Sequence, residues 1–186
     1  MRRSIVKKKW YAFGTREVVF AALGAALYGV LSFATNMIAL PAAGNVALRP
    51  AVCIPMFFGV VFGPWVGFIS GFLGNIIGDA LSGWGFWIWW DIGNGLMGMI
   101  PGFALPLITS FRATKSLIIA DIFVVVGVVV GMGFSSLTEV VFSGLDFATA
   151  FTGYFLPAAL TDIVNGIILV PILMVAYDAI ASRSGR

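Results

Sequence analysis

The sequence predicts an all-α, polytopic membrane protein with six transmembrane helices and both termini in the cytoplasm. Of its 186 residues, 60% are hydrophobic and 10% are charged, and the mean hydropathy is +1.04. Soluble globular domains carry about 25% charged residues. The length suits about six spans of about 20 residues with short loops. We therefore expect no soluble nucleotide-hydrolysing domain beside them.

Six apolar segments, separated by turns and short polar linkers, define the expected spans. They cover residues 17–35, 50–62, 64–81, 92–108, 116–137 and 153–178. The second segment is short for a membrane helix, so we expect it to be tilted or flanked by embedded loop. The chain then divides into a basic cytoplasmic segment over 1–16, a transmembrane domain over 17–178 and a cytoplasmic tail over 179–186.

The positions of the basic residues predict the orientation. With six spans and a cytoplasmic N-terminus, every Lys and Arg except Arg49 falls on the inner side. Cytoplasmic loops of membrane proteins carry such an excess. An odd number of spans would divide the basic residues between the two faces. The expected location is therefore the cell membrane.

The sequence lacks the residues that several kinds of chemistry need. The chain has no histidine and one cysteine, Cys53. Zinc, haem and iron–sulfur sites usually need Cys or His ligands, and a Ser/His or Cys/His pair is impossible. We expect no metal site, no cofactor in this chain, no nucleic-acid partner and no enzymatic activity. Asp79, Asp91 and Asp162 nevertheless leave an intramembrane enzyme open as an alternative.

Polar side chains gather toward the outer ends of the expected spans. The stretch 63–95 places Asn75 and Asp79 one helical turn apart, before four tryptophans in an expected loop over 82–91. A carboxylate in the centre of a membrane helix costs about 2.5–3.5 kcal/mol. Several such polar groups on the outer side of the membrane indicate a water-accessible pocket for a small molecule. The candidate binding residues are Arg49, Asn75, Asp79, Trp84, Trp87, Trp89, Trp90, Asp91, Asn94, Glu139, Asp162 and Asn165.

Two features of this pattern have a simpler alternative. Tryptophan gathers at membrane interfaces without any ligand, so the tryptophan loop is either a set of interface anchors or a lid over the pocket. Small residues four apart, such as Gly67 and Gly71, indicate closely packed helices. In the first span Ala21, Ala22, Ala25 and Ala26 form a stripe, which faces either a neighbouring span or a separate membrane partner.

The run RPAVCIPMFFGVVFGPWVGFISGFLGNIIGD, the basic N-terminus and the alanine stripe resemble the S components of energy-coupling factor (ECF) vitamin transporters. The resemblance covers residues 17–178. It implies a subunit that captures a vitamin from outside and docks on a membrane-embedded T component driven by two cytoplasmic ATPases. ATP would be used by those partners. The resemblance assigns docking to Ala21, Ala22, Ala25 and Ala26, and a gate to the linker 36–49.

The expected outer region carries five acidic residues against Arg49, which disfavours anionic ligands. Within the family the sequence looks most like the cobalamin-type S components, and cobalamin is rich in amides. Thiamin or a related pyrimidine is the next candidate. A solitary carrier or channel for a small molecule, working without ATPases, is the alternative from another class.

Overall fold

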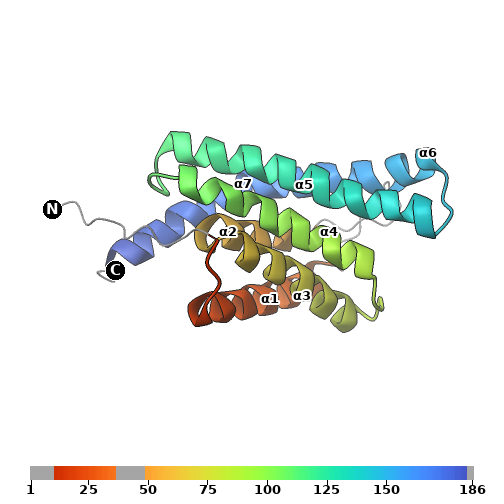
Figure 1. Cartoon of the computed structure of the whole chain (residues 1–186), viewed down its shortest axis with the longest axis horizontal. Coiled ribbons are helices and arrows are strands. Elements are labelled where there is room, and N and C mark those ends of the chain that lie inside the picture. The colour runs from red at the N-terminus through yellow and green to blue at the C-terminus, as the bar shows by residue number, and fades with distance from the viewer. Residues whose placement is uncertain (1–10, 37–48, 184–186) are drawn as a thin grey trace.

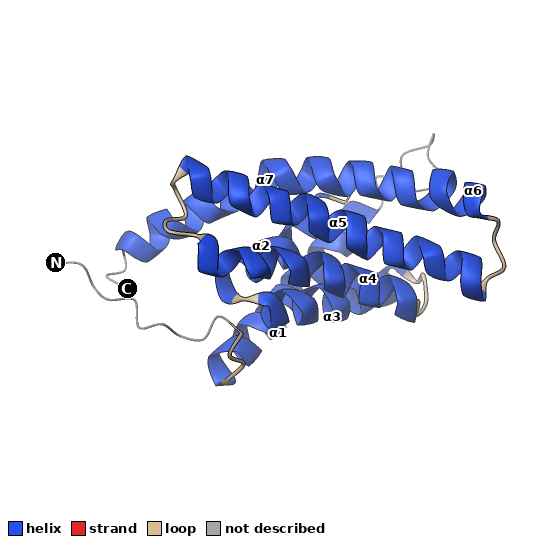
Figure 2. Ribbon diagram, turned by 45° about the horizontal axis from the view of Figure 1, so that its top comes forward, coloured by secondary structure: helices blue, strands red, loops and turns tan. Residues whose placement is uncertain are grey.

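The computed structural model describes residues 11–36 and 49–183. Within these ranges all regular structure is helical and no strand occurs, which confirms the predicted all-α class (Figure 2). The elements are α1 (Thr15–Asn36), η1 (Pro50–Val52), α2 (Cys53–Phe62), α3 (Pro64–Ser82), α4 (Ile88–Met99), η2 (Ile100–Leu107), α5 (Thr114–Phe142), α6 (Phe147–Thr149), η3 (Ala150–Phe155) and α7 (Leu156–Arg183).

In the part of the chain that the structure describes, four helical segments are long and apolar enough to cross a membrane. They are Thr15–Thr35, Pro64–Ser82, Thr114–Phe142 and Phe147–Arg183. The segment Pro50–Phe62 is apolar but shorter, as the sequence predicted. Between α3 and α5 the chain returns through α4 and then η2, where Pro101 and Pro106 interrupt regular α-helix. A count of six membrane spans remains a prediction.

The helices lie side by side in an elongated bundle (Figure 1). α1 begins and α7 ends at one end of the bundle, and the connections α3–α4 and α5–α6 lie at the other end. We call this second end the loop end. Residues 1–10 and 184–186, which hold much of the predicted positive charge, lie outside the described residues.

The predicted tryptophan loop over 82–91 was too long. α3 ends where Gly83 and Gly85 adopt φ values of 72° and 91°, which glycine tolerates best. α4 then begins at Ile88, with Asp91 in its first turn, where a negative charge favours the helix dipole. Trp89, Trp90 and Asp91 are therefore helical, and the loop is confined to residues 83–87.

The predicted linker over 138–152 was also too long. α5 continues to Phe142, and the chain turns at Gly144 with φ of 69°. Asp146 then caps α6, because its Oδ1 accepts a hydrogen bond of 3.0 Å from the Thr149 backbone N–H. This bond holds the pKa of Asp146 below its usual value. At the other end of the last helix, α7 runs on to Arg183, into the predicted tail.

Glycines set the spacing between the central helices, as their four-residue interval predicted. A Cβ at Gly67 would meet the backbone carbonyl of Gly98, and one at Gly71 would meet that of Asn94. α3 and α4 thus approach backbone to backbone. The lone Cys53 is 6% exposed and packs in the apolar core.

Candidate functional site

The centre of the site is Asn75 on α3. Its Nδ2 donates to Asp79 Oδ2, one turn further along α3, at 2.9 Å. The same nitrogen donates to Asp91 Oδ1 on α4 at 2.8 Å. Asn75, Asp79 and Asp91 are all buried, with exposed fractions of 3%, 7% and 0%. One amide group therefore holds together two carboxylates from different helices.

Asn94 extends this network toward α1. Its Oδ1 accepts a 2.7 Å hydrogen bond from the hydroxyl of Tyr28, and its Nδ2 donates to the Trp90 carbonyl at 2.9 Å. Tyr28 and Asn94 are fully buried. The sequence reasoning missed Tyr28. The signal was present, since Tyr28 follows Ala21 and Ala25 by seven and three residues and so shares their buried helix face.

Arg49, directly before η1, joins the network to α7. Its Nη1 lies 3.5 Å from Asn75 Oδ1, and its Nη2 lies 3.4 Å from Asn94 Oδ1. The same Nη2 forms an ion pair of 3.5 Å with Asp162 Oδ2. Four helices and the start of η1 thus converge at the loop end of the bundle. The network holds one guanidinium and three carboxylates, so the site disfavours anionic ligands.

Several buried polar atoms in this region have no hydrogen-bond partner among the described residues. They are Ser32 Oγ, Asp91 Oδ2, Asp162 Oδ1 and Asn165 Nδ2. A buried polar group left unpaired costs about 1–3 kcal/mol. Such atoms are therefore candidates for contacts with a ligand.

The four tryptophans divide into two groups. Trp84 and Trp87 are half exposed, and Trp87 Nε1 donates to the Trp84 carbonyl within their own loop. Trp89 stacks on Phe142 with ring centroids 4.8 Å apart. Only Trp90 is bonded to the network, through the Asn94 amide. The positions of the first three suit membrane-interface anchors, and a role as a lid remains a prediction.

Glu139 and Asp146, predicted as outer acids, have different positions. Trp90 Nε1 donates to Glu139 Oε1 at 2.8 Å, so Glu139 borders the network. Asp146 is exposed and caps α6. Of the predicted gate 36–49, residues 37–48 lie outside the described residues.

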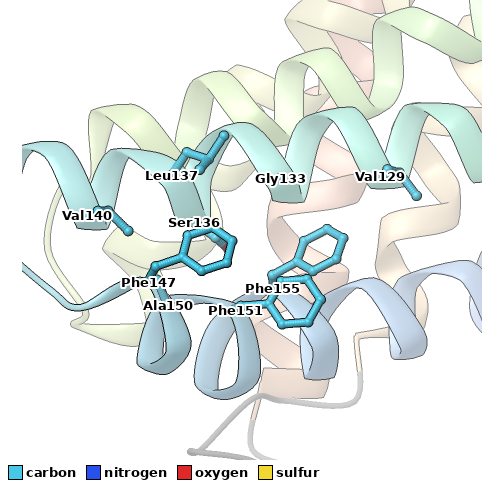
Figure 3. A pocket seen from close by; sticks show the side chains of 9 residues that line it. All are labelled: Val129, Gly133, Ser136, Leu137, Val140, Phe147, Ala150, Phe151 and Phe155. Atoms are coloured by element: carbon cyan, nitrogen blue, oxygen red, sulfur yellow. The ribbon is translucent and has the colours of Figure 1, made fainter.

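A cavity of about 340 Å³ lies between α5 and the segment formed by α6 and η3 (Figure 3). Its walls are apolar, and they include Phe147, Phe151 and Phe155, whose rings stack in sequence. Ser136 is the polar residue in its wall. The sequence reasoning did not predict this cavity, although the four-residue spacing of the phenylalanines could have indicated an aromatic face.

The alanine stripe of α1 is divided between two faces. Ala21 and Ala25 are 2% and 3% exposed, and the Ala21 carbonyl accepts a hydrogen bond from Ser70 Oγ on α3. Ala22 and Ala26 are exposed. In this structure only the second pair is free to contact a partner, and docking remains a prediction for it.

Comparison with known proteins identifies the family. The sequence model of the family described as ECF-type riboflavin transporter, S component, matches residues 12–179. The chain belongs to this family. The S-component family predicted from the sequence is thus confirmed, and it is a transporter family rather than an enzyme family. Its description names riboflavin, and nothing in the match supports the cobalamin-type specificity.

Proteins of two bacteria are similar to this chain over most of its length. A UPF0397 protein of Vibrio atlanticus (strain LGP32) is 32% identical over 178 residues, which cover 92% of this chain and 94% of the relative. A UPF0397 protein of Aliivibrio salmonicida (strain LFI1238) is 36% identical over 142 residues, which cover 73% of this chain and 76% of the relative.

Proposed function

We propose that this chain is the substrate-binding membrane subunit of an ATP-driven ECF vitamin importer. It captures a vitamin from outside the cell and delivers it through a T component and two cytoplasmic ATPases, which use the ATP. In this proposal α2 and the α4–η2 pair complete six membrane spans, and both termini are cytoplasmic.

The observation that carries this proposal is the buried polar network at the loop end of the bundle. Side chains from α1, α3, α4 and α7 meet there with Arg49, and several polar atoms stay unpaired. Ionisable groups inside a membrane bundle are costly and usually mark a substrate or ion pathway. The positive-inside pattern of the sequence supports an orientation with this end outside the cell.

We propose riboflavin as the vitamin, in place of the cobalamin predicted from the sequence. The description of the family supports riboflavin. The charges of the site support a ligand without a carboxylate, because a ligand anion would face Asp79, Asp91 and Asp162 with Arg49 as the one counter-ion among the described residues.

The test is binding and uptake with the purified chain. Riboflavin, thiamin and cobalamin are titrated against the protein in nanodiscs, and Asn75→Leu serves as the site variant. We expect riboflavin to bind with the highest affinity and Asn75→Leu to weaken that binding at least tenfold. Uptake into liposomes should require the T component, both ATPases and ATP.

Three further outcomes would distinguish the importer from its alternatives. Uptake into liposomes that contain this chain alone would support a solitary carrier. Turnover of a small substrate or lipid, abolished by Asp79→Asn, Asp91→Asn or Asp162→Asn, would support an intramembrane enzyme. Copurification of two ATPases and a membrane scaffold from the host would support the importer.

A further inference from the structure

The cavity between α5 and the α6–η3 segment, which we call the lateral cavity, lies apart from the polar network. Its volume of about 340 Å³ falls in the range of about 300–1,000 Å³ that is typical of small-molecule sites. None of the described residues that line it takes part in the hydrogen bonds joining Asn75, Asp79 and Asp91. The lateral cavity is therefore a separate candidate site.

Apolar side chains on the outer surface of the bundle border the lateral cavity. Leu137 on α5 is 54% exposed, and Phe147 and Phe151 on the opposite wall are 62% and 40% exposed. Lipid tails are as apolar as such side chains, so these residues face the bilayer in a membrane-spanning bundle. A ligand that enters between them comes from the hydrocarbon of the bilayer and not from water.

The wall opposite α5 has an uncommon backbone. η3 is a π-helical segment, and such segments are rare and frequent at functional sites. Figure 3 shows the rings of Phe147, Phe151 and Phe155 projecting from this side toward α5. Their centroids are 6.0 and 5.3 Å apart along the row. The row gives an extended apolar surface, which matches the shape of an acyl chain.

One polar side chain interrupts these apolar walls. Ser136 is 4% exposed, and its Oγ has no hydrogen-bond partner among the described residues. Serine in a helix often donates to the carbonyl four residues earlier, as Ser135 does to Gly131 at 3.1 Å. The Ser136 hydroxyl is left with a free donor, and rotation about χ1 can turn it without moving the backbone.

The length of α5 indicates the depth of Ser136 in the membrane. The helix has 29 residues and is about 43 Å long, close to the 40–45 Å of a whole bilayer with its headgroups. The hydrocarbon core spans about 30 Å of that, so it ends about four or five residues before each end of the helix. Ser136, which precedes Phe142 by six residues, therefore lies near the edge of the hydrocarbon, at the level of lipid ester carbonyls.

The charges beside the lateral cavity are negative. The sequence over 138–156 contains Glu139 and Asp146 and no Lys or Arg. Glu139 accepts a hydrogen bond from Trp90 Nε1, whereas Asp146 is exposed and directly precedes Phe147 in the cavity wall. An ammonium group complements such a carboxylate through charge-assisted hydrogen bonds. An anionic headgroup finds no counter-ion in this stretch.

We propose that the lateral cavity binds one acyl chain of a phosphatidylethanolamine molecule. An ester carbonyl of the lipid accepts a hydrogen bond from Ser136 Oγ, and the headgroup ammonium lies beside Asp146. Phosphatidylcholine has no N–H donor in its headgroup, and phosphatidylglycerol carries a net negative charge, so both bind less well. This inference goes beyond the proposed function and does not depend on which vitamin binds.

The test is native mass spectrometry of the full-length protein released from nanodiscs that contain the three lipids in equal parts. We expect retained phosphatidylethanolamine to exceed phosphatidylglycerol by about tenfold. Gly133→Leu fills the lateral cavity and should abolish this retention. A Cβ at Gly133 would lie 3.7 Å from Phe155 Cε2, an ordinary contact, so the backbone accepts a side chain there.

The matched control is Gly153→Leu in η3. Gly153 does not line the lateral cavity, and a Cβ there meets no atom within 4 Å. This variant should retain phosphatidylethanolamine like the unmodified protein.

Two smaller changes test the polar contacts. Ser136→Ala should weaken retention of phosphatidylethanolamine about three- to tenfold, as for loss of one neutral hydrogen bond. Asp146→Asn keeps a good helix cap and removes the charge. It should therefore abolish the preference for phosphatidylethanolamine over phosphatidylcholine. If Gly133→Leu fails to fold, these two variants decide.

The outcomes separate this inference from the proposed function. Equal retention of the three lipids by the unmodified protein, or retention of phosphatidylethanolamine by Gly133→Leu, would overturn the lipid site. Riboflavin titration of Gly133→Leu should match that of the unmodified protein, and loss of riboflavin binding would overturn the separation of the two sites. A chain that retains phosphatidylethanolamine and binds no vitamin would overturn the proposed function alone.

Discussion

Tyr28 reaches from α1 to the contact between α3 and α4. Its hydroxyl bonds to Asn94 Oδ1 at 2.7 Å and lies 3.5 Å from Asn75 Oδ1. It is the one described side chain of α1 bonded to both asparagines, and it orients them for their other partners. Because Asn75 and Asn94 contact Arg49 as well, the phenol connects the first helix to the candidate site.

Replacing Tyr28 by Phe removes this hydroxyl and keeps the ring. We expect Tyr28→Phe to lower the free energy of unfolding by about 1–2 kcal/mol, since one buried hydrogen bond is lost and Asn94 Oδ1 loses its best donor. Riboflavin affinity should fall in parallel. Thermal unfolding in detergent, followed by circular dichroism, measures the first effect.

The matched control is Tyr177→Phe. The Tyr177 ring packs against Phe57, Phe62 and Phe111, and no hydrogen bond of its hydroxyl is found within residues 11–36 and 49–183. This change should be nearly neutral. If Tyr28→Phe and Tyr177→Phe lowered the free energy of unfolding equally, the hydrogen bond from Tyr28 to Asn94 would not be what stabilises the protein.

At the scale of elements, close contact between α3 and α4 brings Asn75 and Asp91 together. Gly71 faces the backbone carbonyl of Asn94, with no room for a Cβ. We expect Gly71→Ala to force α3 and α4 apart and to destabilise the protein by about 1–3 kcal/mol, because overpacking shifts backbone. Gly71→Ala should weaken ligand binding more than it lowers stability, since the Asn75–Asp91 hydrogen bond spans the contact between α3 and α4.

Gly153→Ala in η3 is the control for Gly71→Ala. A Cβ there meets no atom within 4 Å. Thermal unfolding and riboflavin titration of both variants should separate a steric effect from a general effect of losing glycine. Unchanged binding by Gly71→Ala would show that the helix contact does not set the site.

The element boundaries show where sequence reasoning failed. Trp89, Trp90 and Asp91 were predicted to lie in a loop over residues 82–91. The structure confines the break to residues 83–87, since two glycines with positive φ complete the turn. Asp91 then enters α4 and faces Asn75, which a position in a loop would not have ensured.

At the scale of the whole molecule, the exposed half of the alanine stripe offers a surface to a partner. We expect Ala22→Trp to abolish uptake in liposomes that contain the T component and both ATPases, while riboflavin binding remains. Ile172→Trp, on an exposed position of α7, is the control and should transport normally. Normal uptake by Ala22→Trp would exclude docking through this face.

The orientation in the membrane is testable with two matched serine positions. Ser143 lies in the α5–α6 connection at the loop end, and Ser110 precedes α5 at the opposite end; both are exposed. The native Cys53 is buried, so it should react little. We expect an impermeant maleimide to label Ser143→Cys on intact cells and Ser110→Cys only after permeabilisation. The reverse pattern would invert the proposed topology.

The sequence by itself determined the all-α class, the positions of the helices to within about six residues and the family. Apolar segments of sufficient length leave helices as the natural solution in a membrane, because every backbone group must bond within its own segment. The pattern also predicted that Asn75, Asp79, Asp91, Asn94 and Asp162 would lie toward one end. Their role in binding remains a prediction.

Only the tertiary structure decided which of these side chains meet. Helix periodicity places a residue on a face, but the rotation and spacing of α1, α3 and α4 follow from glycine contacts between backbones distant in sequence. That packing bonds Tyr28 to Asn94, buries Ala21 and Ala25, and keeps Trp84 and Trp87 out of the described network. It also leaves Asp162 Oδ1 and Asn165 Nδ2 without a partner among the described residues, since hydrogen-bond partners are fixed by three-dimensional distance and not by spacing along the chain.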